Sequence, residues 1–465
     1  MQFNKVTPDI LRKLVDALSA DCVVTDQDAL EPFTHDYTED LRFVPEVACL
    51  PRTAEQIQAL MRIASEHRVP VTPRAGGTGL SGGALPILGG ILLSCHRMNR
   101  ILEIDRENLV GVVEPGVITQ VFQEEAEKVG LFYGPDPASR GSCTLAGNVA
   151  ENAGGPRAVK YGVTKDWVLG AEAVLADGTL IKTGGKLYKD VTGYNLTQVL
   201  VGSEGTLAII TKLFMKLIPW PPYRKVLLAP FSSLDQAAQA VTAVFMKGVQ
   251  PSACELIERD AAQAAVRQLG KEWPHPDAAA HLLLEADGYS AERVDEEAMI
   301  MGEACMEVGA EDVFIAEDEP RMREIWSLRR SIGEAVKSIN IYKEEDTVVP
   351  RNRIPDLIRG IKAIAARYGL LTICYGHAGD GNIHCNIIKT VDDETWANAL
   401  PAAIAEIFQH TASLGGQVSG EHGIGYVQRE YLPITQGRAE IALMKGIKDH
   451  FDPMGILNPM KIFPG

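Results

Sequence analysis

Apolar and polar positions follow two periods along the chain, and together they predict a protein of mixed helices and strands. Apolar residues recur at helical spacing after Pro8, which predicts a first helix. Thr53 with Gln56 three residues later forms a capping box that starts a second helix. In the first 218 residues, helices are expected at 8–18, 53–67 and 117–129. Apolar runs typical of strands cover 69–73, 91–94, 109–113 and 206–217. An Asp177-Gly178 pair between two apolar runs predicts a hairpin within residues 173–183.

The pattern changes at the cluster Pro219-Trp220-Pro221-Pro222, which cannot continue a strand ladder or enter a helix interior. Beyond this boundary a strand–helix–strand order occurs twice, within 226–257 and within 281–316. Two such units predict a ferredoxin-like sheet with its helices on one face. Further helices are expected at 319–338, 354–368, 394–414 and 438–451, with a hairpin around Gly379. The predicted fold class is therefore α+β.

A glycine-rich run at residues 73–83 is the first chemical signal. Consecutive glycines let backbone N–H groups approach a ligand closely, and such nests bind phosphate. Gly77-x-Gly79-x-x-Gly82 matches the dinucleotide fingerprint, but Pro86, Gly89 and Gly90 follow where that fingerprint needs a helix. A Rossmann NAD site is thus disfavoured, and a glycine-rich turn without a ligand is the alternative.

A second unusual run covers residues 135–155 and combines hydroxyls, asparagine amides and bare backbone with few charges. These groups suit a flat heteroaromatic ring and a ribityl chain, although a tightly packed segment also needs alanine and glycine.

Histidines and a carboxylate suggest a metal site in the second half. His377 and His384 flank the turn sequence Gly379-Asp380-Gly381 between two apolar strands, so a hairpin would bring both imidazoles to one end. Glu421 is the plausible third ligand, which gives the two-histidine, one-carboxylate set of catalytic zinc sites. Mn²⁺, Fe²⁺ or Co²⁺ also suit these ligands. Polar residues that satisfy a turn are the alternative interpretation.

Composition excludes several classes of partner and location. The formal net charge of −16 argues against nucleic-acid binding. The longest apolar stretch is interrupted by Pro86 and Gly89, so we expect no membrane span, and charged residues near the start disfavour a signal peptide. The 8 cysteines form no Cys-x-x-Cys pair, which fits reduced thiols in the cytoplasm and disfavours an internal iron–sulfur cluster.

Taken together with residues 202–211, the two glycine-rich runs resemble the FAD-binding domain of the vanillyl-alcohol oxidase and p-cresol methylhydroxylase (PCMH) superfamily. Residues 376–384, 419–425 and 451–459 are similar to the branch of glycolate oxidase FAD subunits, D-lactate dehydrogenases and D-2-hydroxyglutarate dehydrogenases. This resemblance covers essentially the whole chain. It implies a PCMH-type FAD-binding domain of two subdomains at 1–220, a ferredoxin-like substrate (cap) domain with the metal site at 221–437, and a C-terminal helical segment at 438–465 that returns to the FAD domain.

The resemblance also implies non-covalent FAD, because the first glycine loop lacks the histidine that links flavin in some relatives. The 73–83 nest would hold the pyrophosphate, the second run would line the ring and ribityl chain, and Glu204 and Ile209 would lie near the adenosine. The residues expected to bind FAD are Pro73, Arg74, Gly76, Gly77, Thr78, Gly79, Gly82, Gly83, Pro135, Asp136, Ser139, Thr144, Gly147, Asn148, Gly154, Gly155, Gly162, Glu204, Gly205, Ile209 and Asn458.

Four residues are expected to act on the substrate. His422, next to the expected ligand Glu421, would be the general base that takes the hydroxyl proton as hydride leaves C2, and a further metal ligand is its alternative role. Arg329 of a Trp-x-x-Arg helix would pair with the substrate carboxylate, with Asn386 as a further hydrogen-bonding group. Lys343 is a weaker candidate, because the acids that follow it lengthen the family's pattern. These acids favour a monocarboxylate.

The resemblance implies a dehydrogenase of a small D-2-hydroxy acid, of the glycolate or D-lactate type, with D-2-hydroxyglutarate as the alternative substrate. A metallohydrolase that uses the histidine and carboxylate cluster belongs to a different class, and a superfamily member whose reaction ends in bond formation, such as alkylglycerone-phosphate synthase, is a third. Electrons would pass to a partner, namely an iron–sulfur subunit, an electron-transferring flavoprotein, a cytochrome or quinone. The expected location is the cytoplasm, with peripheral attachment to the inner membrane through that partner as an option, and a homodimer is considered.

Overall fold

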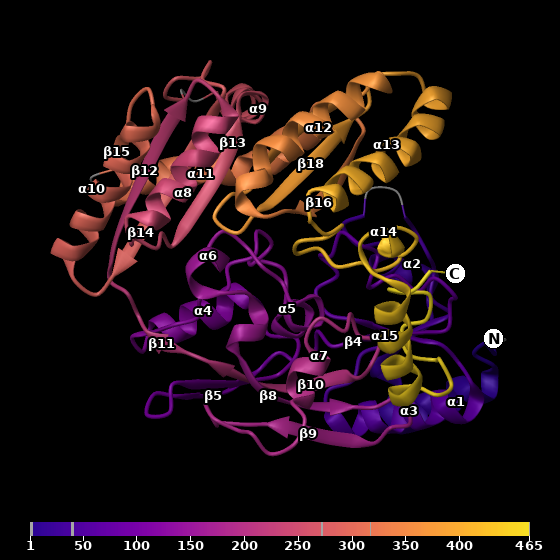
Figure 1. Cartoon of the computed structure of the whole chain (residues 1–465). Coiled ribbons are helices and arrows are strands. Elements are labelled where there is room, and N and C mark those ends of the chain that lie inside the picture. The colour runs from indigo at the N-terminus through magenta and orange to yellow at the C-terminus, as the bar shows by residue number, and fades with distance from the viewer. Residues whose placement is uncertain (1–2, 39–40, 271–272, 317, 465) are drawn as a thin grey trace. The chain divides into compact units, whose positions relative to one another are not determined.

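The computed structural model describes residues 3–38, 41–270, 273–316 and 318–464. Its chain forms two compact units (Figure 1), the first of which comprises Met1–Ala153, Val163–Trp220 and His422–Gly465. The second comprises Gly154–Gly162 and Pro221–Glu421. Both units combine helices with sheets, so the expected α+β class is confirmed. Within the described ranges, no helix is both long and apolar enough to cross a bilayer.

The first unit begins with a small sheet of strand order β1-β2-β4-β3, in which β2, β4 and β3 run parallel. These strands are β1 (Val23–Val24), β2 (Val47–Cys49), β3 (Val71–Arg74) and β4 (Ile91–Ser94). Helices α1 (Pro8–Leu18) and α3 (Ala54–His67) share a hydrophobic core with it that includes Leu14, Leu60 and Ile91. The Thr53 side chain accepts a hydrogen bond from the Gln56 amide, so the predicted cap of α3 is present.

A second sheet of the first unit is antiparallel, with strand order β5-β6-β10-β8-β9. Its strands are β5 (Ile101–Asp105), β6 (Val110–Val113), β8 (Val168–Val174), β9 (Leu180–Gly184) and β10 (Ile209–Lys216). Strands β8 and β9 form the predicted hairpin, in which Val174 pairs with Leu180 and Gly178 takes a left-handed φ of 84°. A separate ribbon pairs β7 (Leu131–Phe132) with β11 (Ile218–Pro219).

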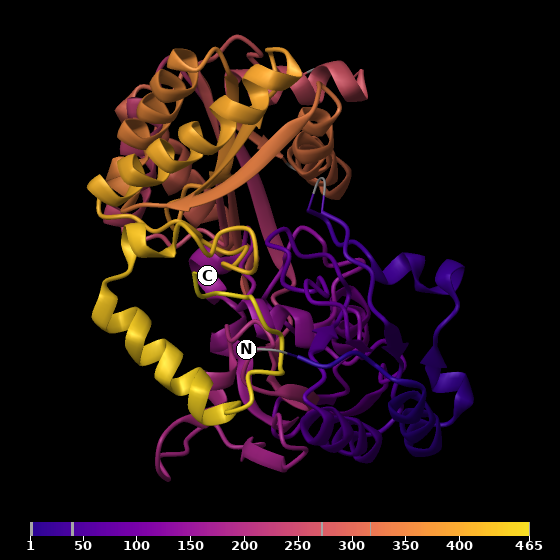
Figure 2. The ribbon, with the colours of Figure 1, turned by 90° about the vertical axis from the view of Figure 1, so that its right-hand side faces the viewer.

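The longest of the other helices in the first unit is α15 (Arg438–Phe451), shown in yellow at the edge of that unit (Figure 2). Each described residue of α15 is at least partly exposed. The other helices are α2 (Gln27–Leu30), α4 (Thr119–Glu127), α5 (Leu145–Glu151), α7 (Leu196–Leu200) and α14 (Leu432–Thr435). The 3₁₀ turns are η1 (Ala20–Cys22), η2 (Glu31–Phe33) and η3 (Thr164–Trp167).

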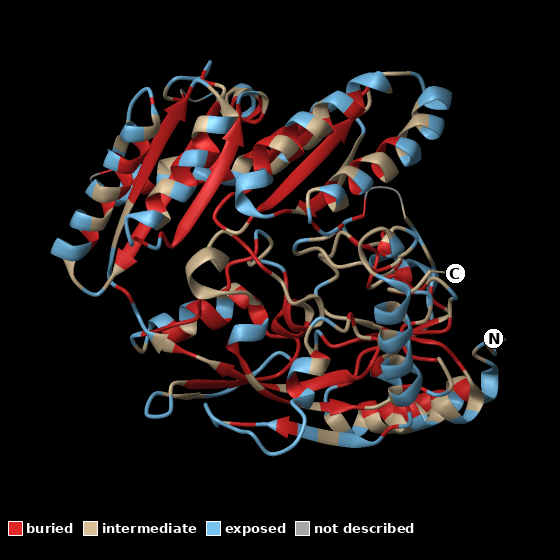
Figure 3. Cartoon of the chain, viewed as in Figure 1, coloured by how far each residue is buried: buried red, intermediate tan, exposed pale blue. Residues whose placement is uncertain are grey.

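One antiparallel sheet of order β15-β12-β14-β13-β17-β18-β16 organises the second unit. Its strands are β12 (Tyr223–Phe231), β13 (Ala253–Glu258), β14 (Ala280–Gly288), β15 (Phe314–Ala316), β16 (Tyr342–Val348), β17 (Leu371–His377) and β18 (Asn382–Ile388). The first four strands in this order are the fourth, first, third and second along the chain, which is the ferredoxin-like arrangement. Figure 3 shows that most of the strand surface is buried.

The helices of the two predicted strand–helix–strand units lie on one face of this sheet, as expected, but further helices cover the other face. Helices α8 (Leu234–Met246) and α10 (Ala291–Val308) pack together on one side, where Gly302 of α10 lies near Leu227. Helices α9 (Arg259–Leu269) and α11 (Glu319–Lys337) pack on the other side against a core that includes Val226 and Tyr375. The other helices are α6 (Ala158–Tyr161), the 3₁₀ turn η4 (Arg351–Arg353), α12 (Ile354–Arg367) and α13 (Asp393–Ser413).

The β17–β18 hairpin carries both predicted metal-binding histidines. Its register pairs His377 with Asn382 and Tyr375 with His384, and side chains alternate between the two faces of a strand. Both histidines therefore project from the face that α9 and α11 cover. The turn between the strands needs glycine at residue 381, where φ is 88° and an added Cβ would lie 2.0 Å from the Val349 carbonyl oxygen.

The turn predicts a stability difference between two glycine substitutions. Gly381→Ala should lower the free energy of unfolding by at least about 1–2 kcal/mol, because a left-handed backbone is unfavourable for a side chain and the clash adds to that cost. Gly446→Ala is the matched control, because Gly446 lies inside α15 with no atom within 4 Å of an added Cβ. Alanine at residue 446 should raise the free energy of unfolding by up to about 1 kcal/mol, because alanine favours the helix more than glycine does. Thermal unfolding monitored by circular dichroism measures both, and equal stability of Gly381→Ala and the parent chain would contradict the analysis.

Candidate active site

Three side chains of the second unit converge as metal ligands do. His377 Nε2 lies 3.5 Å and His384 Nε2 lies 3.4 Å from the same oxygen, Glu421 Oε1. The two imidazole rings stand nearly perpendicular, with centroids 5.4 Å apart. One ligand atom from each residue lies within 4.8 Å of the others, so a single divalent ion fits between two nitrogens and one carboxylate oxygen. The hairpin and the loop that contains Glu421 thus bring together the three residues expected to bind metal.

The second nitrogen of His377 is held by a buried carboxylate that the sequence argument missed. Glu255 on β13 is fully buried, and its Oε1 lies 2.7 Å from His377 Nδ1. A carboxylate at Nδ1 fixes the ring orientation and leaves Nε2 directed at the ion, as in many metal sites. Glu255 is therefore placed to orient one of the two histidines that are expected to bind metal.

Asp346 on β16 holds the loop that carries the third ligand. Its Oδ2 accepts hydrogen bonds from Ser419 Oγ at 3.0 Å and from the backbone N–H groups of Gly420 and Glu421 at 2.8 and 2.7 Å. The other oxygen accepts one from the amide of Asn382. This buried carboxylate ties the Glu421 backbone to the end of the hairpin that carries both histidines.

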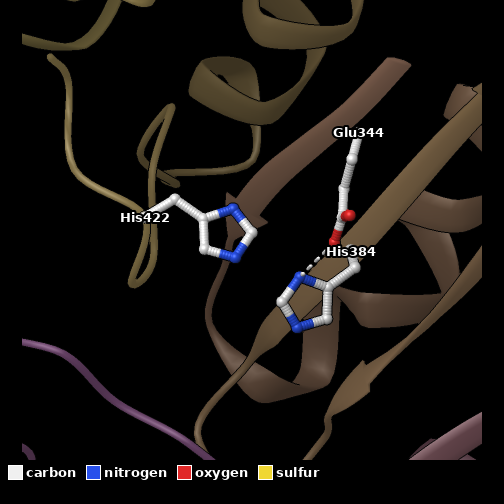
Figure 4. Close-up of side chains that lie close together, drawn as sticks. All are labelled: Glu344, His384 and His422. Carbon is white, nitrogen blue, oxygen red and sulfur yellow. Dashed lines mark ion pairs between the residues drawn. The ribbon is translucent and has the colours of Figure 1, made fainter. Parts of the chain in front are cut away.

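Acidic side chains also lie beside His384. Its Nδ1 is 3.6 Å from Glu344 Oε1, as the dashed line in Figure 4 marks, and 4.0 Å from Asp346 Oδ1. On β16, Glu344 and Asp346 lie on one face of the strand and Lys343 on the other. Asp346 pairs with His384, whereas Lys343 pairs with Ile387. Because successive side chains of a strand point to opposite faces, Lys343 points away from the cluster. The structure therefore does not place Lys343 with the other candidate catalytic residues.

The Trp-x-x-Arg motif is explained by two buried glutamates on adjacent strands. Trp326 Nε1 donates to Glu285 Oε2 at 2.8 Å, and Arg329 donates to Glu255 Oε2 through Nε at 2.9 Å. A further contact of 2.6 Å joins Arg329 Nη2 to the same oxygen. The three-residue spacing places both side chains on one face of α11. Glu255 thus links the arginine to His377, and the guanidinium keeps further N–H groups for another acceptor.

Charge and burial shift several pKa values in this cluster. Burial lowers the pKa of His377, but the charges of Glu255 and Glu421 outweigh it and raise the pKa well above its usual value. Burial raises the pKa of Glu255, yet His377 and Arg329 outweigh that effect and hold it below its usual range. Burial also raises the pKa of Asp380 to about 6, against the opposing charge of His377. The acids around His377 therefore favour positive charge at this position.

Asn386 and His422 occupy different units. Asn386 on β18 is fully buried, and neither of its amide atoms makes a hydrogen bond with the described residues. It pairs with Ile373 and Glu344 across the sheet and shares the face of His384. His422 is the first residue of the C-terminal stretch of the first unit, directly after Glu421, which ends the second.

The glycine-rich nest of the first unit fits a bound pyrophosphate. An added Cβ at Gly79 would meet no atom within 4 Å, so space is open in front of the backbone there. Three buried polar atoms around the nest, Arg74 Nη1, Ser81 Oγ and Thr144 Oγ1, make no hydrogen bond with the described residues. A cationic donor and hydroxyls without partners are what an anionic cofactor would satisfy.

Other residues expected to bind FAD are placed less uniformly. Asn458 is buried, and its amide donates to the backbone carbonyls of Gly83 and Glu204 at 3.0 and 2.8 Å. Ile209 lies in the hydrophobic core of the first unit, so its side chain is not available to a ligand. The Glu204 carboxylate accepts two backbone hydrogen bonds from residues 424 and 425. Gly154, Gly155 and Gly162 belong to the second unit.

The rest of the expected FAD set lies in the first unit. Asp136 is buried and accepts a hydrogen bond from Arg140 at 2.9 Å, while Asn148 donates to the Thr119 hydroxyl at 2.6 Å. The backbone at Gly76 and Gly147 is too close to its neighbours for a larger residue. An added Cβ would lie 2.8 Å from the Ser142 carbonyl oxygen at Gly76 and 3.3 Å from the Ala75 Cβ at Gly147. The remaining residues of this set, which also belong to the first unit, are Pro73, Gly77, Thr78, Gly82, Pro135, Ser139 and Gly205.

The sequence contained one signal for the missed residues. Glu255 and Glu285 interrupt strands that are otherwise almost entirely apolar, Ala-Cys-Glu-Leu-Ile-Glu and Ala-His-Leu-Leu-Leu-Glu-Ala-Asp-Gly. A carboxylate at a fully buried strand position needs a charged or hydrogen-bonding partner. This signal identifies such residues as anchors but not which partner each one holds.

Comparison with known proteins identifies the family. Residues 45–184 match a family model described as "FAD binding domain", and residues 220–462 match "FAD linked oxidases, C-terminal domain". The chain is 40% identical to the glycolate oxidase subunit GlcD of Bacillus subtilis over 434 residues, which cover 93% of this chain and 92% of that protein. It is 36% identical to a D-lactate dehydrogenase of Anaerostipes hadrus, with 99% and 98% covered.

Two further comparisons agree with this assignment. A D-2-hydroxyglutarate dehydrogenase of Stutzerimonas stutzeri is 34% identical, with 98% of this chain and 99% of that protein covered. The solved structure of p-cresol methylhydroxylase with substrate bound superimposes with a TM-score of 0.80 at 20% identity, over 98% of this chain and 96% of that one. That structural likeness concerns the fold, which is the PCMH-type fold expected from the sequence.

The family decides between the dehydrogenase and the metallohydrolase, because FAD-linked oxidases are redox enzymes and not hydrolases. The resemblance seen in the sequence motifs is confirmed along nearly the whole chain. This chain belongs to the family of FAD-linked oxidases and is an FAD-dependent oxidoreductase.

Proposed function

We propose that the protein is an FAD-dependent, metal-assisted dehydrogenase that oxidises a small D-2-hydroxy acid, of the glycolate or D-lactate type, to the 2-oxo acid. One observation carries the proposal. In a chain of the FAD-linked oxidase family, two imidazole nitrogens converge on one oxygen of Glu421 at 3.5 and 3.4 Å. The names of the relatives, glycolate oxidase subunit and D-lactate dehydrogenase, support the substrate class.

The first unit would bind FAD without a covalent bond. The open space at Gly79 and the unpaired Arg74 Nη1 and Ser81 Oγ support a pyrophosphate at the nest. FAD bound there supplies the acceptor for the hydride that leaves C2 of the substrate. The same substrate loses its hydroxyl proton, and the two losses together convert the alcohol carbon to a carbonyl.

The second unit would orient the substrate. His377, His384 and Glu421 would hold a divalent ion, with Zn²⁺ as the default for these ligands and Mn²⁺, Fe²⁺ or Co²⁺ as alternatives. A divalent ion at this site supplies a Lewis acid that polarises the C2 hydroxyl and lowers its pKa. Arg329, fixed by Glu255 through one side of its guanidinium, would present its other N–H groups to the substrate carboxylate. The buried Asn386 side-chain amide would form its hydrogen bonds with the same substrate.

His422 would remove the hydroxyl proton. An imidazole is the side chain whose ordinary pKa suits a general base near neutral pH. Its place directly after the ligand Glu421 in the sequence supports this assignment. The products would then be a 2-oxo acid, a reduced flavin and a protonated imidazole, which must release its proton before the next turnover.

The electrons removed from the substrate need an exit outside the chain. The sequence contains no Cys-x-x-Cys pair, and its 8 cysteines are all free and buried. We therefore propose a partner acceptor, either an iron–sulfur subunit, an electron-transferring flavoprotein, a cytochrome or a quinone. Through such a partner the protein would act in the cytoplasm or at the inner membrane surface.

The first test is anaerobic reduction of the bound flavin. Glycolate or D-lactate should bleach the flavin absorbance, whereas L-lactate should leave it unchanged at the same concentration. Removal of the ion with a chelator should slow bleaching by about two orders of magnitude or more, because the Lewis acid is lost. Addition of Zn²⁺ or Mn²⁺ should restore the rate. Equal rates before and after chelation, at full flavin content, would contradict the metal-assisted mechanism.

A second test measures metal content. His384→Ala should abolish stoichiometric metal, because one of three ligands is lost, whereas His281→Ala is the control for loss of a buried histidine outside the cluster. Glu255→Gln keeps the ligands but weakens the group that orients His377, so metal affinity should fall roughly 10–100-fold. Competition with a metallochromic chelator measures these affinities. An affinity of Glu255→Gln equal to that of the parent chain would remove Glu255 from the proposed ligand support.

A third test distinguishes the substrates named for the relatives. Glu344 and Asp346 lie near His384 and Glu255 contacts His377, so the surroundings of the proposed ion are acidic. A second carboxylate on the substrate would meet these like charges. We expect kcat/KM for D-2-hydroxyglutarate to be at least about tenfold below that for D-lactate. A higher value for the dicarboxylate would identify the protein instead as a D-2-hydroxyglutarate dehydrogenase.

A further inference from the structure

A pair of acidic side chains in the first unit has no part in the mechanism above. Glu204 is 7% exposed, and Glu151 at the end of α5 has an Oε2 atom that is inaccessible and makes no hydrogen bond with the described residues. Both face the same glycine: a Cβ added at Gly423 would lie 2.3 Å from Glu151 Oε2 and 3.1 Å from Glu204 Oε1. The two carboxyl groups therefore meet at the residue that follows His422.

The hydrogen bonds of the two acids differ. Glu204 Oε1 accepts from the Ile424 amide at 2.8 Å, and Glu204 Oε2 accepts from the Gly425 amide at 2.6 Å. Two N–H donors stabilise a carboxylate in its charged form, and the Glu151 Oε2 atom has no such donor among the described residues. Of two neighbouring carboxyl groups removed from water, one keeps its proton, because two like charges in a buried site repel each other. The geometry therefore assigns the charge to Glu204 and the proton to Glu151.

The electrostatic surroundings agree with this assignment. Burial raises the pKa of Glu151, and the charges of Glu204 and Asp36 raise it further. Burial also raises the pKa of Glu204 to about 7, against the two backbone N–H groups and the charge of Lys461. Lys461 is itself buried and donates to the Leu85 carbonyl at 2.7 Å.

Glu204 acts on a loop that is held at four consecutive amides. After Ile424 and Gly425, the amides of Tyr426 and Val427 donate to the Ser81 carbonyl at 2.9 and 3.0 Å. Ser81 belongs to the glycine-rich nest, and an added Cβ at Gly83 in the same nest would lie 3.1 Å from Glu151 Oε1. The acid pair thus lies between the nest and the loop that begins at His422.

We propose that Glu204, paired with Glu151, is a positioning residue that fixes the backbone after His422 on the first unit. The inference rests on the proposed role of His422 as the base. It gives the Glu204 carboxylate a task different from the contact with adenosine that the sequence resemblance implied. A base whose backbone is held by a buried charge keeps one orientation through the proton transfer, which a mobile loop would not provide.

Two substitutions of similar size separate the roles of the pair in the FAD-loaded protein. Glu204→Gln replaces one acceptor oxygen by an NH₂ group that faces a backbone N–H, so one hydrogen bond is lost and two donors oppose each other. Glu151→Gln keeps a neutral donor where we place the proton. Glu172→Gln is the control, because Glu172 lies in the same unit and pairs with Lys212 near the surface. Glu204→Asp keeps the charge and should give an intermediate effect.

Hydrogen–deuterium exchange of the peptide that contains residues 424 and 425 is the primary measurement, since it does not depend on catalysis. Exchange should accelerate roughly tenfold or more in Glu204→Gln, as expected for loss of a hydrogen bond to a charged group, and change little in Glu151→Gln and Glu172→Gln. At saturating substrate, flavin reduction in Glu204→Gln should slow roughly tenfold or more, while flavin content and substrate KM stay close to those of the parent chain.

Each outcome decides a separate point. Unchanged exchange in Glu204→Gln, or equal acceleration in Glu151→Gln, would show that the Glu204 carboxylate does not fix the backbone after His422, whatever the rate of flavin reduction. Accelerated exchange with an unchanged reduction rate would overturn the positioning role. His422→Ala, measured in parallel, tests the proposed function separately. A normal rate of flavin reduction in this variant would show that His422 is not the base, while the exchange result would still decide whether Glu204 fixes the backbone.

Discussion

A carboxylate taken out of water must find positive charge or hydrogen-bond donors, and this requirement organises the candidate site. Glu255 is fully buried and satisfies it with His377 on one oxygen and Arg329 on the other. The same carboxylate therefore contacts both a histidine proposed to bind metal and the arginine proposed to bind substrate. Removing it would leave an imidazole and a guanidinium without the group that orients them.

Asp346 and Glu204 solve the same problem with backbone amides. Asp346 accepts from residues 420 and 421, and Glu204 accepts from residues 424 and 425, so two buried acids hold the chain on either side of His422. Each acid lies in the unit that contains the amides it binds. The short stretch from Glu421 to Gly425 is thus fixed by charge, although it contains neither helix nor strand. Such anchoring suits a loop that must present a ligand and a base in one orientation.

Local sequence signals predicted the elements that local forces determine. The helix Pro8–Leu18, the Thr53 cap and the helix at 291–308 follow from periodicity and capping residues, and the structure has them at the expected positions. Helix α9 and strand β16 were not predicted. The apolar residues of α9 recur with helical spacing, so the sequence does carry a signal for this helix, whereas the acidic run 344–346 of β16 lacks the alternating apolar residues typical of a strand. The helices on the second face of the sheet depend on packing between distant segments, which periodicity does not record.

The same division applies to the candidate site. The His377–His384 hairpin could be found from its turn residues, since the two strands are adjacent in the sequence. The partners of Glu255 lie more than 70 residues away, at Arg329 and His377, and require the order of strands in the sheet. Lys343 lies on the opposite face of β16 from Glu344 and Asp346, and the sequence alone did not show this, because the face changes at every position of a strand. Fold likeness adds little here, since p-cresol methylhydroxylase shares the architecture at 20% identity.

The central claim is that a divalent ion held by His377, His384 and Glu421 contacts the alcohol oxygen of the substrate. Electron–nuclear double resonance on the Mn²⁺-loaded protein tests it, with D-lactate or glycolate that carries ¹⁷O in the C2 hydroxyl. The flavin is reduced beforehand with dithionite under anaerobic conditions, so that it cannot accept a hydride and the substrate stays intact. The account predicts an ¹⁷O hyperfine coupling typical of an oxygen bound directly to the ion. A spectrum identical to that of unlabelled substrate, at saturating concentration and full metal content, would contradict it.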